Sequence, residues 1–237
     1  MTVYRNPIAY TGNLSASLVL FDIDGTLVRR TGPYHLKALV EGVRQITGAE
    51  TSTEGIPVHG MLDPAILAIM LRRIDCPEAE IGSLIQRINA VAEEVYLATV
   101  PDLRDKTCPG VPELLAALSV REVPMVLVTG NLTRIGWRKL EQAGIHHHFR
   151  YGAFGEMAAT RGLLATLAIA RAREEKLIDV HSRISLIGDT PQDVQAAREN
   201  GVRAIGVRTG ITPPGELESA APDLLLDDLS RVDPAIF

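Results

Sequence analysis

Two carboxylates, Asp22 and Asp24, directly follow the apolar run at residues 18–21. Such a run predicts a strand buried on both faces, and the carboxyl edge of a parallel sheet is where open α/β folds place their ligands. Residues two apart in a strand point the same way, so the carboxylates would repel unless one is protonated or a hard cation lies between them. Gly25 permits a close turn, and Thr26 offers a hydroxyl and an N–H group to an anion. The alternative is a strand-to-loop boundary with an Asp-rich turn that has no catalytic role, because such a turn has the same residue pattern.

A second apolar strand, expected over residues 123–128, ends at Thr129, Gly130 and Asn131. The Thr129 hydroxyl and the N–H groups of the following helix would form a cradle for phosphate oxygens. An ordinary turn with Asn131 as the N-cap residue is the alternative.

A third strand, expected over residues 184–187, is followed by Asp189 and, in the first turn of the next helix, by Asp193. Asp189 is predicted to be a metal ligand, and Asp193 either a further ligand or a support for one. Because residues 190–193 read Thr-Pro-Gln-Asp, a helix capping box is a structural alternative for Asp193.

Alternating strands and helices must position these strand ends. Apolar periodicity predicts strands at 17–21, 123–128, 150–153, 184–187 and 203–207, an edge strand at 224–226, and helices at 111–119, 131–144, 160–175 and 191–200. This alternation predicts a parallel sheet with helices on both faces.

Residues 33–100 carry only helical periodicity. Helices are expected from Tyr34 to Gly48, from Asp63 as N-cap, and from near Pro77 to Pro101. Their apolar stripes predict a small bundle, since none can be buried alone. We therefore expect a core of residues 1–32 and 101–237 with 33–100 as a cap, hinged at 28–33 and 101–110.

The chain of 237 residues is 46% hydrophobic and 22% charged, which is ordinary globular composition. A net charge of −5 leaves no basic surface for nucleic acid or anionic membranes. No stretch has the length of a signal peptide or membrane span, which predicts a cytoplasmic protein. Cys76 and Cys108 lack metal-site spacing. We expect small-molecule partners and a monomer or homodimer.

The segment Asp22-Ile23-Asp24-Gly25-Thr26-Leu27-Val28 resembles the first motif of the haloacid dehalogenase-like phosphohydrolases. Residues 129–131 and 188–193 resemble its second and fourth motifs, and the helical insert is similar to that of the phosphoglycolate-phosphatase-like branch. The resemblance implies a Rossmann-like doubly wound parallel sheet with an inserted helical cap. It also implies Mg²⁺-dependent hydrolysis of a small phosphomonoester through an aspartyl phosphate.

The resemblance also implies residue roles. Asp22 would attack phosphorus, and Asp24 would act as acid and then base. The family usually has a lysine before the fourth motif; here Arg161 stands at the start of the preceding helix, with Lys176 a less favoured substitute. Catalysis would rest on Asp22, Asp24, Thr129 and Arg161, phosphate binding on Gly25, Thr26, Gly130 and Asn131, and Mg²⁺ binding on Asp22, Asp24 through its carbonyl, Asp189 and Asp193.

Other functions of the same fold stay open. Haloacid dehalogenases lack the second carboxylate, so Asp24 argues against carbon–halogen chemistry. Phosphonatases need a lysine from the cap, and the insert contains only Lys37. A phosphosugar mutase would use the same residues, and a non-catalytic phospho-ligand-binding module is a further alternative. Arg29, Arg30, His35 and residues 59–63 lie where a cap would meet a leaving group, although each also fits a surface role. Residues 146–148, three histidines, fit a solvated loop better than a metal site.

Overall fold

The computed structural model describes residues 14–29 and 32–237. Its sheet has the strand order β3-β2-β1-β4-β5-β6, and all neighbouring strands are parallel. The strands are β1 Ser15–Phe21, β2 Met125–Val128, β3 Gly152–Ala153, β4 Ile178–Gly188, β5 Arg203–Val207 and β6 Leu224–Leu226. The chain winds outward from β1 in both directions, so the prediction of a doubly wound parallel sheet is confirmed.

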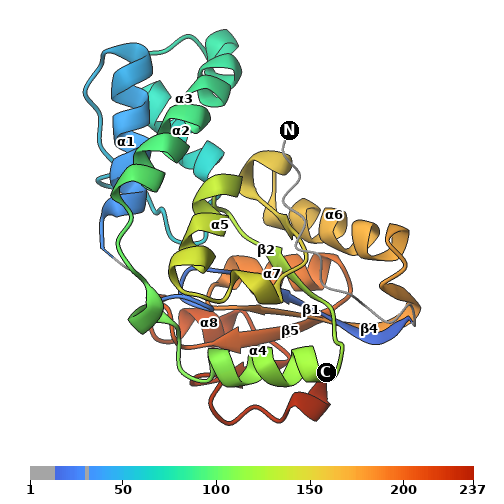
Figure 1. The fold of residues 1–237 in the computed structure, drawn as a ribbon. Helices are drawn as coiled ribbons and strands as arrows, with labels where there is room; N and C mark the ends of the chain where they lie inside the picture. The colour runs from blue at the N-terminus through green and yellow to red at the C-terminus, as the bar shows by residue number, and fades with distance from the viewer. Residues whose placement is uncertain (1–13, 30–31) are drawn as a thin grey trace.

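Helices cover both faces of this sheet (Figure 1). They are α4 Val111–Val120, α5 Thr133–Gln142, α6 Arg161–Glu174, α7 Pro191–Glu199 and α8 Glu216–Ser219. Val19 and Phe21 of β1 pack into the same cluster as α4, while Leu18 and Leu20 pack into the same cluster as α6 and α7. All four side chains are fully buried, which explains why the strand is apolar at every position.

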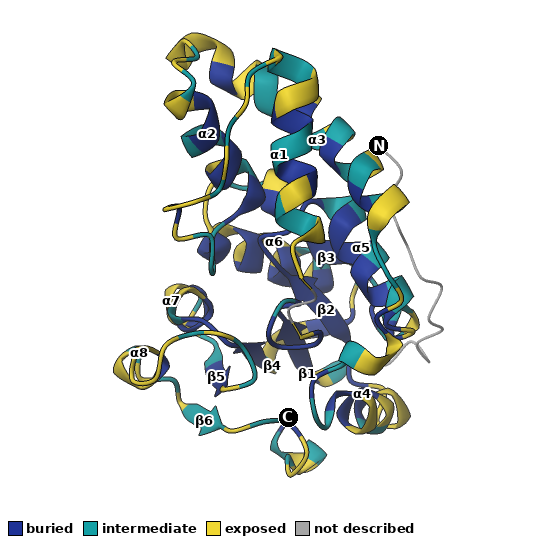
Figure 2. Ribbon diagram, turned by 90° about the vertical axis from the view of Figure 1, so that its left-hand side faces the viewer, coloured by how far each residue is buried: buried dark blue, intermediate teal, exposed yellow. Residues whose placement is uncertain are grey.

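Three helices form the inserted cap at one end of the molecule: α1 Tyr34–Thr47, α2 Asp63–Arg73 and α3 Glu78–Thr99. Figure 2 shows exposed residues on their outer surfaces and buried residues between them. Their apolar faces form a separate hydrophobic cluster. Two residues of the core also pack into this cluster: Leu132, which precedes α5, and Ile135, which lies in α5. The limits of core and cap at residues 33 and 100 stay a prediction.

Several local predictions need correction. Strand β4 begins at Ile178, ahead of the expected residue 184, because residues 179–183 are exposed or half-buried and lack the apolar run that marks a buried strand. Gly48 ends α1 in a left-handed conformation as expected. Asp63 and Asn131 are not N-caps: Leu62 and Leu132 occupy those positions. Short 3₁₀ turns are η1 Arg104–Lys106, η2 His146–His148, η3 Gly155–Met157 and η4 Pro234–Ile236.

Three predictions fall wholly or partly outside the described residues, because residues 1–13 and 30–31 are not described. These are Arg30 as a leaving-group contact, the hinge at residues 28–33 and the part of the core expected over residues 1–32. Among the residues that are described, no helix combines the length and apolar character needed to cross a membrane.

Candidate active site

A cavity of about 110 Å³ lies where three central strands end. In the sheet register Phe21 of β1 pairs with Leu127 of β2 and with Ile187 of β4, so the segments that follow these residues meet at one edge. The core lines the cavity with Asp22, Asp24, Gly25, Thr129, Gly130, Asn131, Lys139, Arg161 and Asp189, and the cap with His35, Leu36, Val58, His59, Gly60, Met61, Asp63 and Ile66. The cap therefore closes over the predicted reaction centre.

Asp22 lies in a group of three carboxylates. Oxygens of Asp22, Asp189 and Asp193 are all within 4.8 Å of one another, and each residue is buried. Arg161 Nη1 lies 2.8 Å from Asp22 Oδ1 and 2.6 Å from Asp193 Oδ1. Burial and the neighbouring carboxylates outweigh the attraction of Arg161 and raise the pKa of Asp22 to about 8. The three carboxylates thus carry more negative charge than one guanidinium balances.

The surroundings of the Asp189 carboxylate test whether this group fits a cation. It is 1% exposed, and within the described residues no hydrogen bond reaches either of its oxygens. His59 Nε2 lies 3.4 Å from Oδ2, and burial raises the pKa of Asp189. Gly25 is left-handed here, with φ 87°, and a Cβ on it would lie 2.4 Å from Asp189 Oδ2. A buried carboxylate without hydrogen bonds, beside two more, fits a hard cation that takes oxygen ligands.

Asp193 forms the capping box that was the structural alternative for it, and its role at a metal stays a prediction. One oxygen completes the capping box of α7, because Oδ2 accepts from Thr190 N at 3.1 Å and from Thr190 Oγ1 at 2.6 Å. Its other oxygen, Oδ1, faces Arg161. The capping box at the start of α7 therefore also orients the Asp193 carboxylate toward the carboxylates of Asp22 and Asp189.

Asp24 follows the same strand but has different partners. Lys139 Nζ lies 2.6 Å from each of its carboxylate oxygens, and Asn131 Nδ2 donates to Oδ2 at 2.8 Å. Burial alone would raise its pKa, but the charge of Lys139 and these hydrogen bonds lower it to about 2. Its side chain stays 39% exposed. Separate cations thus relieve the repulsion expected between Asp22 and Asp24.

The loop after β2 differs in part from the predicted cradle. Asn131 does not cap α5, because its Nδ2 donates to Thr129 Oγ1 at 2.7 Å and to Asp24. The first N–H groups of α5 donate to carboxylates of other elements: Leu132 to Asp63 at 2.8 Å, Thr133 to Glu156 at 3.0 Å and Arg134 to Glu93 at 2.9 Å. These N–H groups are therefore not available to a phosphate. Thr129, Gly130 and Asn131 line the cavity, whereas the fully buried Thr26 does not.

Lys139 is the main site residue that the sequence analysis missed. It is 3% exposed although it belongs to α5, a helix with charged residues on its outer side. The available signal is its spacing of four from the buried Ile135, which places it on the inward face of the helix. A lysine at an inward position calls for a buried partner.

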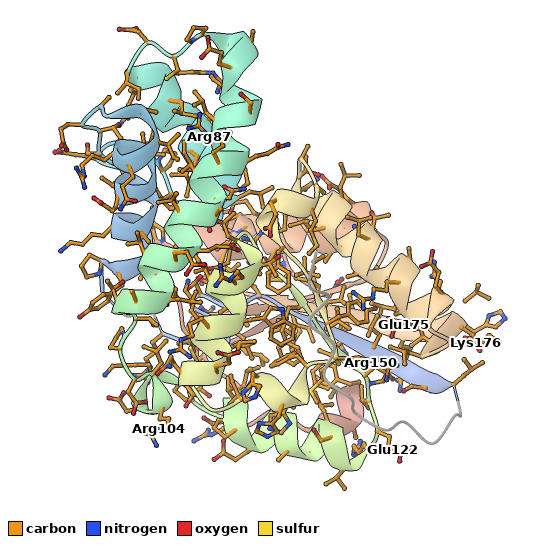
Figure 3. All side chains as sticks on the ribbon, turned by 45° about the horizontal axis from the view of Figure 1, so that its top comes forward. Arg87, Arg104, Glu122, Arg150, Glu175 and Lys176 are labelled. Atoms are coloured by element: carbon orange, nitrogen blue, oxygen red, sulfur yellow. The ribbon has the colours of Figure 1, made fainter. Side chains whose placement is uncertain are left out.

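Other candidates lie away from the cavity. Lys176 follows the far end of α6 from Arg161, about 21 Å away along 14 helical residues. Figure 3 shows it beside Arg150 and Glu175, so it cannot replace Arg161. Lys37 and Arg29 are exposed and do not line the cavity. Residues 146–148 do not line it either. Among the described residues one group is placed to share a metal ion, namely the acidic trio of Asp22, Asp189 and Asp193.

Comparison with known proteins places this geometry in a family. The haloacid dehalogenase-like hydrolase profile matches residues 16–201. The chain belongs to this family. It is 30% identical over 233 residues to a phosphoglycolate phosphatase of Agrobacterium fabrum, a match that covers 93% of this chain and 92% of that protein. The predicted family and branch and the predicted phosphatase class of enzyme are confirmed.

Solved structures of other proteins share the fold. The crystal structure of a predicted phosphoglycolate phosphatase from Haemophilus somnus matches with a TM-score of 0.64 at 20% identity, over 92% of this chain and 97% of that one. A β-phosphoglucomutase from Clostridium difficile matches with a TM-score of 0.67 at 16% identity, over 92% and 93% of the two chains. Both support the sheet core with an inserted cap.

Proposed function

We propose that this haloacid dehalogenase-like hydrolase is a Mg²⁺-dependent phosphatase that cleaves a small phosphomonoester through a phosphoenzyme on Asp22. The observation that carries the proposal is the contrast between the two carboxylates after β1. Asp22 lies with two further carboxylates and Arg161, while Asp24 is held apart by Lys139. Carboxylates with pKa values pushed apart by their surroundings are suited to different steps of one reaction.

The acidic trio would hold the metal through Asp22, Asp189 and Asp193, with the Asp24 carbonyl as a further ligand. Bound Mg²⁺ would keep Asp22 ionised and offset the negative charge of the phosphate. Asp22 attacks phosphorus, and Arg161 and Thr129 stabilise the charge on the equatorial oxygens. Asp24, in contact with the cavity, is ionised before substrate binds, because its pKa is about 2. The negative charge of a bound phosphate would raise that pKa, so that Asp24 takes up a proton, donates it to the leaving oxygen and then takes one from water.

The cavity supports a small substrate. Its volume of about 110 Å³ is below the range of roughly 300–1,000 Å³ typical of pockets for drug-sized ligands. Its cap side is partly apolar, with Leu36, Val58 and Ile66, and carries His35 and His59. The cytoplasmic location and the monomeric or homodimeric state remain predictions.

The test combines substitution of each carboxylate with detection of the phosphoenzyme. Asp22→Asn should abolish phosphate release and acid-quenched phosphoenzyme, because the nucleophile is lost. Asp24→Asn should slow turnover by about 10²- to 10⁴-fold. With a nitrophenyl ester, whose leaving group needs little protonation, phosphate should accumulate on the peptide containing Asp22. Wild-type turnover by Asp22→Asn, or phosphate found only on Thr26 or Thr129, would overturn the mechanism.

Product analysis separates the alternatives. A sugar phosphate converted to its isomer without phosphate release would indicate a mutase. Binding of phosphorylated ligands without turnover by the wild-type protein would indicate a non-catalytic module.

A further inference from the structure

A chain of polar side chains connects the cap to Asp24. His35 Nε2 lies 2.8 Å from Asp63 Oδ2, and His35 Nδ1 lies 3.2 Å from Lys139 Nζ, which in turn contacts both oxygens of Asp24. Asp63 and Lys139 are each 3% exposed at the side chain, and His35 19%. His35 and Asp63 belong to α1 and α2 of the cap, whereas Lys139 and Asp24 belong to the core.

The direction of each hydrogen bond follows from the chemistry of its ends. A lysine ammonium can only donate, so His35 Nδ1 must accept and the imidazole proton must lie on Nε2. That proton is donated to Asp63, which also accepts from Leu132 N at 2.8 Å and is thereby anchored to the core. Lys139 makes its remaining contact with Asn131 Oδ1 at 2.6 Å. The donors of the ammonium are thus shared among Asp24, Asn131 and His35.

We propose that Lys139 is a positioning residue for Asp24, and that the cap pair His35–Asp63 completes its coordination when the cap is docked. This inference rests on the proposed phosphatase function. The ammonium would hold the Asp24 carboxylate toward the cavity and away from the acidic trio. Proton transfer to the leaving oxygen would then be aligned only under a closed cap, when water is excluded from the phosphoenzyme.

A double-mutant cycle tests whether His35 acts through Lys139. Lys139→Met and His35→Ala should each lower turnover of an alkyl phosphate by about tenfold or more, with a much smaller effect on a nitrophenyl ester. The double variant should be no slower than Lys139→Met alone, since Lys139→Met already removes the contact through which His35 would act on Asp24. Additive losses, or equal losses on the two esters, would overturn the proposal. Arg138→Met, beside Lys139 but paired with Glu141 on the outside of α5, is the matched control and should leave both rates unchanged.

A second measurement needs no turnover. In ¹⁵N NMR spectra of the wild-type protein at mildly alkaline pH, the His35 ring should carry its proton on Nε2, and Lys139→Met should weaken that preference. A proton on Nδ1 would overturn the proposal even if Lys139→Met fails to fold.

If Asp22→Asn remains active while the Nε2 tautomer is found, the proposed function fails and the polar chain stands. If a phosphoenzyme forms on Asp22 but the tautomer or the cycle disagrees, only the present inference fails.

Discussion

Replacement of Gly130 by alanine should displace the cap loop from the active site. A Cβ at Gly130 would lie 2.3 Å from the carbonyl oxygen of Met61, whereas ordinary contact begins at 3.4 Å. The Met61 carbonyl would therefore have to withdraw by 1.1 Å, the difference between these two distances. The Met61 oxygen belongs to the backbone and the position of a Cβ is fixed by its own backbone, so no side-chain rotation can relieve the overlap. The strain is one of contact, because Gly130 is not among the glycines with positive φ.

The core side of this contact has little room to move instead. Gly155 lies so close to Gly130 that a Cβ on Gly155 would lie 2.2 Å from the Gly130 oxygen. The cap loop must move, and the hydrogen bond from Asp63 N to Gly130 O, now 2.9 Å, would lengthen. Misplacement by about 1 Å can cost roughly 10²-fold in rate, and we expect that loss in kcat/KM. Loss of one hydrogen bond should cost only about 0.5–1.5 kcal/mol of stability.

The assay is kcat/KM for phosphate release from an alkyl phosphate, with a thermal melt of the same sample. Gly82→Ala is the matched control: Gly82 lies within α3 of the cap, and a Cβ there meets nothing within 4 Å. It should keep wild-type activity and gain about 0.5–1 kcal/mol, because alanine favours helix over glycine. A folded Gly130→Ala protein with wild-type kcat/KM would show that close docking of the Met61 loop is not required.

Two further predictions concern the metal. Asp189→Asn should raise the Mg²⁺ concentration needed for half-maximal activity steeply or abolish turnover, and full wild-type activity in excess chelator would contradict a metal at this site. Metal-free protein should lose stability as the pH rises from about 4 to about 8, because the folded chain keeps a proton on Asp22 that the unfolded chain releases near 3.8. Since Mg²⁺ needs ionised Asp22, its increase of Tm should be larger near pH 8 than near pH 5, and an equal increase at both would refute this.

Much of the site was predictable from local sequence. The apolar run before Asp22 has to be buried on both faces, and the strands before Thr129 and Asp189 have the same character. Parallel strands meet at one edge, so these residues converge whichever helices join them. The capping box of Asp193 is also local, because it joins residues within one helical turn.

The partners of these residues were decided only by the tertiary structure. Lys139 reaches Asp24 across 115 positions in the chain, and Asp63 takes the Leu132 N–H across 69. A sequence pattern reports which face of a helix is buried but not which side chain it meets there. Asn131 has the residue type of an N-cap, yet its amide contacts Asp24 and Lys139. The N–H groups that it would otherwise satisfy, those of Thr133 and Arg134, donate instead to Glu156 of the core and to Glu93 of the cap. The division of labour between Asp22 and Asp24 follows from those distant charges.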